Sequence, residues 1–304
     1  MSLLGAACAF LAAAIWGGLY VASRYVLDFI PPLTLVAVRF AIGLVVLGSV
    51  LLATRGKLVA RRDLPEMALV GLVGFGISIF AQFAGTRLSG AANGALITSA
   101  TPALVVVFAR LLLGEALVPH RLLGLALAMV GVLVVSDPAA ARLSSDALLG
   151  NALLVLAAVT WALYSVLAKR AARRYPVLTV TTYAALSGVL FTAPLAPVEW
   201  ALVGPPAAHL PPLAVLGVLY IGVVSTAGAF YLWNKGMALL DASAAAVFFF
   251  AQPVVGTFLG WLLLHEQLGP TFFLGGGLIL AGVGVVSLAA PCQAARAPGA
   301  PRPH

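Results

Sequence analysis

Residues 91–136 read AANGALITSATPALVVVFARLLLGEALVPHRLLGLALAMVGVLVVS, and this pattern returns without a gap at residues 242–287. The aligned pairs that apolar bias cannot explain are Pro102 with Pro253, Glu115 with Glu266, Pro119 with Pro270, Gly124 with Gly275 and Gly131 with Gly282. Apolar composition could match leucine with leucine by chance, but it would not align prolines, glycines and a glutamate in one register. The chain is therefore read as a duplication before anything else.

The composition indicates that lipid is the solvent of this chain. It has 304 residues, of which 62% are hydrophobic and 9% are charged. A soluble domain is about half apolar and about a quarter charged, so this chain could not cover its surface with polar groups. Its apolar runs approach the ~20 residues that a spanning helix requires, whereas strands of a membrane barrel alternate apolar and polar residues over about ten. We predict an all-α membrane protein.

Ten apolar segments can be marked, and the short connections between them leave no room for a soluble domain. They cover about residues 3–23, 33–53, 66–86, 91–113, 120–136, 147–168, 177–195, 212–234, 242–264 and 271–290. With the N-terminus inside, most Lys and Arg residues fall in connections that face the cytoplasm, which is the bias that orients membrane proteins. Both termini are therefore predicted to be cytoplasmic. The net charge of +8 is explained by this bias, and no nucleic-acid partner is predicted.

The duplication divides the chain into two predicted five-helix repeats, residues 1–137 and 138–290, followed by a Pro-rich tail, residues 291–304, predicted to be disordered and cytoplasmic. Because five is odd, the second repeat must cross the membrane in the opposite sense to the first. Inverted repeats are typical of secondary transporters, in which two halves rock around a substrate held near the midplane. The sequence thus predicts a carrier in the lipid bilayer with a small-molecule substrate.

The predicted fourth and ninth spans each contain a proline near the middle, Pro102 and Pro253. A proline frees the backbone carbonyl four residues earlier, here at Thr98 and Phe249, and that carbonyl needs a partner or a wet cavity. A plain structural kink explains either proline alone, whereas their symmetric placement favours a pair of hinges.

Polar and aromatic side chains surround these bends and the middle of other spans, and they are the predicted substrate-binding residues. They are Trp16, Tyr20, Gln82, Thr98, Thr101, Trp161, Tyr164, Tyr231, Phe249 and Gln252. For each aromatic residue, a place in the cavity competes with ordinary packing.

Three charged residues have two interpretations each. Arg39 lies inside an apolar run, where a buried cation is costly, so it is either a structural anchor or an anion site. Glu115 and Glu266 close their spans at opposite membrane faces, and each either is hydrated or paired with nearby basic groups, or forms a gate contact in one state only. No carboxylate lies at mid-membrane, which disfavours a proton relay through Asp or Glu.

Other classes of protein are less consistent with the sequence. Cys8 and Cys292 make no disulfide framework and no zinc site, so neither a metal nor another cofactor is predicted. The four histidines lie in predicted loops, ends or the tail, which argues against an intramembrane enzyme. An ATP-driven pump is disfavoured because no phosphate-binding loop motif is present. A channel or a scaffold without carrier activity remains an alternative, and Gly-rich fifth and tenth spans indicate close packing or a homodimer face.

At these residues the chain resembles the EamA family of the drug/metabolite transporter superfamily. The matching features are Trp16-Gly17, Arg39-Phe40, residues 89–96 reading SGAANGAL, and in both copies the proline followed by Leu-Leu-Leu-x-Glu. The resemblance implies a ten-helix carrier of the bacterial inner membrane with two inverted halves, whose relatives include exporters of amino acids and other small metabolites. It also implies a cavity lined by spans one, three and four of each half. Residues 98–101 are hydroxyl-rich and the matching residues 249–252 are partly aromatic, so the predicted solute is amphipathic.

Overall fold

The computed structural model describes residues 2–89, 94, 97–135, 145–264 and 270–288, and all regular elements in these ranges are helices. The first half contains α1 (Leu3–Val26), α2 (Pro32–Ala53), η1 (Arg61–Asp63), α3 (Leu64–Gly71), η2 (Leu72–Ser78), α4 (Ile79–Ser89), α6 (Thr101–Leu113) and α7 (Pro119–Val135). The second half contains α8 (Ser145–Ala171), α9 (Val177–Thr192), α10 (Leu195–Val203), α11 (Pro212–Leu219), η4 (Tyr220–Gly228), α12 (Ala229–Leu239), α13 (Ala242–Val247), η5 (Phe248–Phe250), α14 (Ala251–Leu264) and α15 (Pro270–Leu288). The all-α prediction is confirmed.

The described helices make this a multi-pass membrane protein. Six helical stretches are long and apolar enough to cross a membrane, and the count rises to seven if α9 and α10, bent by 42° at a short break, form one span. Three shorter apolar helices cover Thr101–Leu113, Pro119–Val134 and Phe272–Val286. These correspond to the predicted fourth, fifth and tenth spans, and the predicted total of ten stays a prediction.

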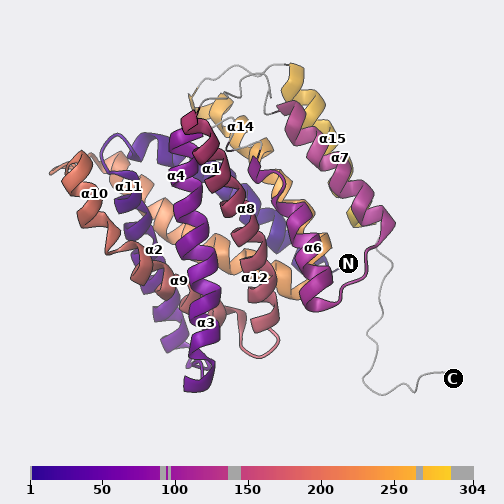
Figure 1. Cartoon of the computed structure of the whole chain (residues 1–304), viewed down its shortest axis with the longest axis horizontal. Coiled ribbons are helices and arrows are strands. Elements are labelled where there is room, and N and C mark those ends of the chain that lie inside the picture. The colour runs from indigo at the N-terminus through magenta and orange to yellow at the C-terminus, as the bar shows by residue number, and fades with distance from the viewer. Residues whose placement is uncertain (1, 90–93, 95–96, 136–144, 265–269, 289–304) are drawn as a thin grey trace.

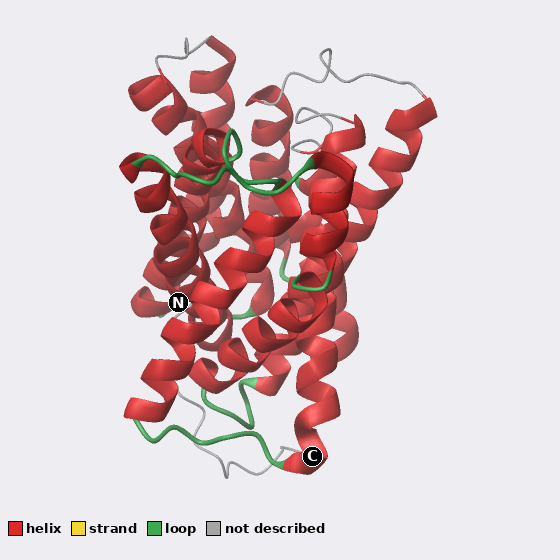
Figure 2. Ribbon diagram, turned by 90° about the vertical axis from the view of Figure 1, so that its left-hand side faces the viewer, coloured by secondary structure: helices red, strands yellow, loops and turns green. Residues whose placement is uncertain are grey.

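The two halves are interleaved, with the first helix of each half lying in the other half. Helix α1 packs along α12 and α14, and α8 packs along α4 and α6. The first span of each half therefore contacts the third and fourth spans of its counterpart. Most helices run between two ends of the molecule at which the loops gather (Figure 2). Any space at the centre is consequently lined by residues of both halves.

Helices α7 and α15 form a separate pair along one edge of the molecule (Figure 1). A Cβ atom on Gly124 would lie 2.6 Å from the carbonyl oxygen of Gly282, and one on Gly131 would lie 2.6 Å from that of Gly275. The two backbones thus approach as closely as glycine permits. Because residue numbers rise along one helix as they fall along the other, the two helices run antiparallel. The glycines predicted from the sequence serve here to pack the fifth and tenth spans against each other.

One stretch of π-helix, which is wider than an α-helix, interrupts the third span of each half. The two stretches are η2 and η4, and each continues directly into an α-helix, α4 and α12 respectively. The offset that places Ala91 on Ala242 also makes the two stretches overlap. Wide turns of this kind inside long helices are frequent at functional sites.

Candidate functional site

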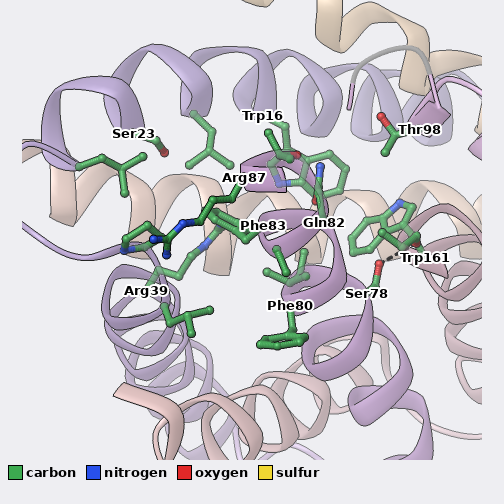
Figure 3. Close-up of a pocket in the computed structure, with 18 of the residues that line it drawn as sticks. Trp16, Ser23, Arg39, Ser78, Phe80, Gln82, Phe83, Arg87, Thr98 and Trp161 are labelled. Atoms are coloured by element: carbon green, nitrogen blue, oxygen red, sulfur yellow. Dashed lines mark hydrogen bonds between the residues drawn. The ribbon is translucent and has the colours of Figure 1, made fainter. Parts of the chain in front are cut away.

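A cavity of about 970 Å³ lies between the halves, lined by residues of α1, α2, α4, α8, α10, α12 and the α6 and α14 regions. It reaches side chains as exposed as Arg87 and Leu202, the latter 79% exposed, so the cavity extends to one end of the bundle. Figure 3 shows Arg39 and Arg87 on one side of it, with Trp16, Gln82 and Trp161 on the other. The cavity is large enough for a small organic molecule.

Four aromatic side chains form the inner wall of the cavity: Trp16, Trp161, Phe230 and Phe249. The ring centroids of Trp16 and Trp161 are 5.5 Å apart, and Phe230 lies 5.3 Å from Trp16 and 5.6 Å from Trp161. Phe249 is 6.1 Å from Trp16. Most of these pairs meet edge to face, which places a positive ring edge on a negative ring face and fixes the wall.

The two tryptophans differ in how their indole N–H groups are satisfied. Trp16 Nε1 donates a hydrogen bond to the carbonyl oxygen of Ser225 at 3.0 Å. Trp161 is 8% exposed, and its Nε1 has no hydrogen-bond partner in the described part of the chain. Buried donors are nearly always paired, so an unpaired one that lines a cavity is suited to an acceptor atom of a ligand.

The hydroxyl groups of the cavity wall are held by the backbone. Thr98 Oγ1 donates to the carbonyl oxygen of Gly94 at 2.6 Å, and Ser78 Oγ donates to that of Ala157 at 2.9 Å. Both hydrogens are thereby used, and the oxygen atoms can still accept from a ligand. Gln82, Thr101 and Gln252 complete this polar part of the lining.

The end at which the cavity reaches Arg87 and Leu202, called its loop end below, is positively charged. Arg24, Arg39 and Arg87 line it, whereas Glu199 is the only acid among the described lining residues. Arg39 is 4% exposed; its Nε donates to Thr226 Oγ1 at 2.9 Å, and its Cζ lies 5.9 Å from the centre of the Phe230 ring.

The carboxylate of Glu199 is committed to the N-terminus of α2. It accepts hydrogen bonds from the backbone nitrogens of Leu33 and Thr34 at 2.9 and 2.8 Å, and from Thr34 Oγ1 at 2.9 Å. This is a capping arrangement, in which an acid satisfies backbone donors that have no partner inside the helix. Glu199 is thus mainly a structural anchor between α10 and α2.

A network of charged residues links several helices at the opposite end of the bundle. Glu115 pairs with Lys169 at 3.0 Å and accepts from the backbone nitrogens of Ala242 and Ser243 at 3.0 and 3.4 Å. Lys169 Nζ also donates to the carbonyl oxygen of Leu240. Both charged side chains are almost fully buried, so the network ties the ends of α6 and α8 to the turn between α12 and α13.

Arg121 and Asp241 extend this network. Arg121 lies 2.6 Å from the carboxylate of Asp241 and donates to Ser243 Oγ at 3.1 Å. The turn is thus held by α7 as well.

Helix α1 shows that the network and the loop end of the cavity lie far apart. A Cβ atom on Gly5 would lie 2.8 Å from Leu240 Cγ, whereas Arg24, near the other end of α1, lines the cavity. Helix α1 has 24 residues, and at about 1.5 Å per residue it is ~36 Å long. The network therefore lies at one end of the bundle while the cavity extends to the other.

The sequence model of the EamA-like transporter family matches residues 3–137 and, a second time, residues 148–288. This chain belongs to the EamA-like transporter family. The resemblance found from its residues is thereby confirmed.

Named relatives of this EamA-like chain are transporters. It is 27% identical over 274 residues to an "Uncharacterized transporter" of Archaeoglobus fulgidus, covering 89% of this chain and 94% of that one. It is 28% identical over 286 residues to a "Probable amino-acid metabolite efflux pump" of Escherichia coli, covering 90% and 92%. It is 28% identical over 227 residues to a "Probable terminal-alkyne amino-acid exporter" of Streptantibioticus cattleyicolor, covering 74% of each chain. A solved crystal structure superposes with a TM-score of 0.80 at 26% identity, covering 93% of this chain and 96% of that one. The family and these names point to a transporter rather than an enzyme.

In this EamA-like chain the structure brings most of the predicted site residues together. Those that line the cavity are Trp16, Arg39, Gln82, Thr98, Thr101, Trp161, Phe249 and Gln252. Tyr164 is fully buried, and its hydroxyl accepts from Asn234 Nδ2 at 2.8 Å. Tyr231 is half-buried against the hydrophobic core. The side chain of Tyr20 and the whole of Glu266 lie outside the described residues.

Pro102 stands at a helix start, whereas Pro253 lies near the middle of one candidate span, Ala242–Leu263. Pro102 is the second residue of α6, and Pro253 is the third residue of α14, just after the narrow turn η5. A proline in the first turn removes a backbone donor that would have no partner inside the helix anyway. A turn at residues 99–100 precedes Pro102, and the short η5 precedes Pro253; the role of the two prolines as hinges stays a prediction.

Sequence reasoning missed Phe230, Glu199 and Lys169. Phe230 stands in an apolar run in which a cavity-facing and a lipid-facing ring look alike. Lys169 carried a usable signal, because the offset that places Trp16 on Trp161 also places Arg24 on Lys169. That pairing marks the end of the first span of each half as a site for a cation.

Proposed function

We propose that this protein is a secondary carrier that exports a small amphipathic metabolite, an amino acid or a similar solute, by alternating access. In this proposal ten spans form two inverted five-helix halves in the bacterial inner membrane, with both termini in the cytoplasm. The observation that carries the proposal is a central cavity, walled by both halves, that extends to one end of the bundle while the buried Glu115–Lys169 pair lies at the other. The antiparallel α7–α15 pair and the reciprocal packing of α1 and α8 support the inverted arrangement.

Glu115 and Lys169 act as the gate in this proposal. Their pair ties α6 and α8 to the turn that begins α13, so a path from the cavity to that face requires the pair to separate. Breaking a buried ion pair by removing one partner costs about 3–5 kcal/mol. Separating the two charges is favourable only if each finds water or another partner, so in this proposal substrate binding or the membrane gradient drives the opening.

The test uses protein reconstituted into proteoliposomes and a panel of radiolabelled amino acids and related acids. We expect Lys169→Met to lower transport at least about tenfold, because Glu115 is left buried without its cation. In Lys169→Met, a cysteine introduced at Ser243 should react faster with a thiol reagent applied from that face than in an otherwise wild-type protein carrying the same cysteine. Exchanging the charges, with Glu115→Lys and Lys169→Glu together, should restore transport only partly, since a lysine cannot accept from the backbone nitrogens of Ala242 and Ser243.

Arg174 offers a matched control just past the same end of α8. It donates to Asp63 at 2.6 Å and to Glu66 at 2.8 Å, and the hydrogen bond and charge of Asp63 raise the pKa of its guanidinium. Its side chain is 49% exposed, and an ion pair exposed to water contributes little to stability. Arg174→Gln should leave transport nearly unchanged. Equal losses in the Arg174 and Lys169 variants would contradict the gate, steady single-channel currents would indicate a channel, and no transport of any solute would leave a scaffold.

A further inference from the structure

The charge distribution in the cavity identifies the kind of head group it accepts. The three arginines stand toward its loop end, and Arg39 lies next to the aromatic wall through Phe230. The only described acid of the lining, Glu199, has its carboxylate occupied by Leu33 and Thr34. A cationic head would therefore meet arginines without an acid to pair with it, whereas an anionic head would meet an opposite charge.

A second donor stands across the aromatic wall from Arg39. Trp161 Nε1 is buried, lines the cavity and has no partner in the described part of the chain, whereas the corresponding nitrogen of Trp16 is bonded to Ser225. A donor in this position is complemented by an acceptor atom of a ligand. Phe230 touches both groups, since its ring centre lies 5.9 Å from Arg39 Cζ and 5.6 Å from the centre of Trp161.

We infer that the substrate is an organic carboxylate with an apolar, ring-sized body, held at its head by the guanidinium of Arg39. The body lies on the wall formed by Trp16, Trp161 and Phe230, and an oxygen atom of the carboxylate takes the hydrogen bond of Trp161. The ammonium group of an amino acid is not required for binding, because no acid of the described lining is available to it. This inference rests on the proposed function and narrows its substrate class.

The arrangement of Arg39 favours recognition over a purely structural role. Its Nε is held by Thr226, and a guanidinium presents its N–H donors in one plane, which is the geometry that meets both oxygens of a carboxylate. Because Arg39 is buried, each such hydrogen bond to an ion is stronger than in water. Lysine would keep the charge at this position but lose the paired geometry.

The test compares ligands that share one body and differ in the head: 3-phenylpropionate, 3-phenylpropylamine, 3-phenylpropan-1-ol and phenylalanine. Binding to purified protein is followed by the fluorescence of the cavity tryptophans and by thermal stabilisation. We expect the propionate to bind about tenfold tighter than the amine and the alcohol, and at least as tightly as phenylalanine. An amine or alcohol that binds as tightly as the acid, or an acid that does not bind, overturns the inference.

Variants then locate the head group. Arg39→Gln should weaken the acid about tenfold and leave the alcohol within about twofold, and Arg39→Lys should fall between the wild type and Arg39→Gln. Equal weakening of acid and alcohol would show that Arg39 only shapes the cavity. If Arg39→Gln does not fold, Trp161→Phe serves instead, because it keeps a ring and removes the donor. This variant should weaken binding of the acid a few-fold more than binding of the alcohol. Equal weakening of the two by this variant also overturns the inference. Arg110→Gln, an exposed position on α6 outside the described lining, is the matched control.

Transport separates a failure of this inference from a failure of the proposed function. Proteoliposomes that move the amine or the alcohol but not the acid leave the carrier intact and refute the carboxylate preference. Proteoliposomes that move no member of a broad solute panel refute the carrier, whatever binds to the purified protein. Transport of the acid, reduced selectively by Arg39→Gln, supports both.

Discussion

The two π-helical segments, η2 and η4, occupy equivalent positions in the two halves, yet their side chains do different things. The offset that pairs Ala91 with Ala242 places Phe75 on Thr226. Phe75 is fully buried and packs 4.3 Å from Phe230 and 5.0 Å from Phe40, measured between ring centres. Thr226 is also fully buried, but it binds Arg39 and donates to the carbonyl oxygen of Ile221 at 2.7 Å.

In both halves, nevertheless, a glycine of a neighbouring helix packs against the π-helical segment. Gly43 of α2 lies against Thr226, and Gly188 of α9 lies against Phe75. The offset that pairs Trp16 with Trp161 also pairs these two glycines. The duplicated fold therefore keeps the close approach of helix and π-segment in both halves, while the buried side chain has diverged from a ring to a hydroxyl. Both halves need the glycine so that the helix can pack against the π-segment. Only Thr226, in the second half, also holds a residue of the ligand site, Arg39.

The largest effect on stability is expected from adding a methyl group at either of these two glycines. A Cβ atom at Gly43 would lie 2.7 Å from Thr226 Cγ2, and one at Gly188 would lie 2.9 Å from Phe75 Cβ. Gly43→Ala and Gly188→Ala should each lower the free energy of unfolding by about 1–3 kcal/mol or more through overpacking, measured by reversible unfolding in mixed micelles. Gly188→Ala should cost more, because Phe75 Cβ is fixed to the backbone.

Gly48→Ala is the control for this pair on helix α2. No atom of the described residues lies within 4 Å of a Cβ atom at Gly48, so the substitution should be neutral or stabilise the helix by about 0.5–1 kcal/mol. If Gly48→Ala lowers the free energy of unfolding as much as Gly43→Ala does, then helix propensity decides the result, and not the contact of the glycine with the π-helical segment.

The sequence predicts the architecture well because its signals are periodic and duplicated. Apolar runs indicate helices, and two aligned copies indicate a site between them. The same composition hides the orientation of side chains, since helices that are apolar on every side do not reveal which face is buried. Tyr164 illustrates this limit: it lies one turn from Trp161, but its hydroxyl meets Asn234 and it does not line the cavity.

Charged residues near predicted loops were harder still to assign. In a sequence, Lys169 and Glu199 look like hydrated helix ends, and only the packing of distant helices buries them. Lys169 meets Glu115 from the other half, and Glu199 meets the start of α2. Contacts across such sequence distances leave no local pattern, except where a repeat offset pairs one cation with another, as with Arg24 and Lys169.

An intermediate effect is expected from making the polar segment apolar. Thr226→Val keeps the shape but leaves Arg39 Nε without its hydroxyl acceptor, at a cost of about 1–3 kcal/mol. The affinity for 3-phenylpropionate should fall as well, because the guanidinium is no longer held in place. Phe75→Leu should cost about 1 kcal/mol of stability or somewhat more, without changing the preference for the acid over the alcohol. A change of ligand preference in Phe75→Leu, or none in Thr226→Val, would contradict the division of roles between the segments.

The smallest effect is expected from the two tryptophans, which extend the same contrast into the cavity wall. Trp16→Phe removes a donor that is bonded to the carbonyl oxygen of Ser225, whereas Trp161→Phe removes a donor without a partner in the described part of the chain. Both lose similar ring area, so their difference isolates one hydrogen bond. Without ligand, Trp16→Phe should be less stable than Trp161→Phe by about 1 kcal/mol. With saturating 3-phenylpropionate the gap should narrow or close, because ligand stabilises Trp16→Phe through the Trp161 donor that the other variant lacks. A gap that is unaffected by ligand would mean that Trp161 Nε1 does not meet the solute.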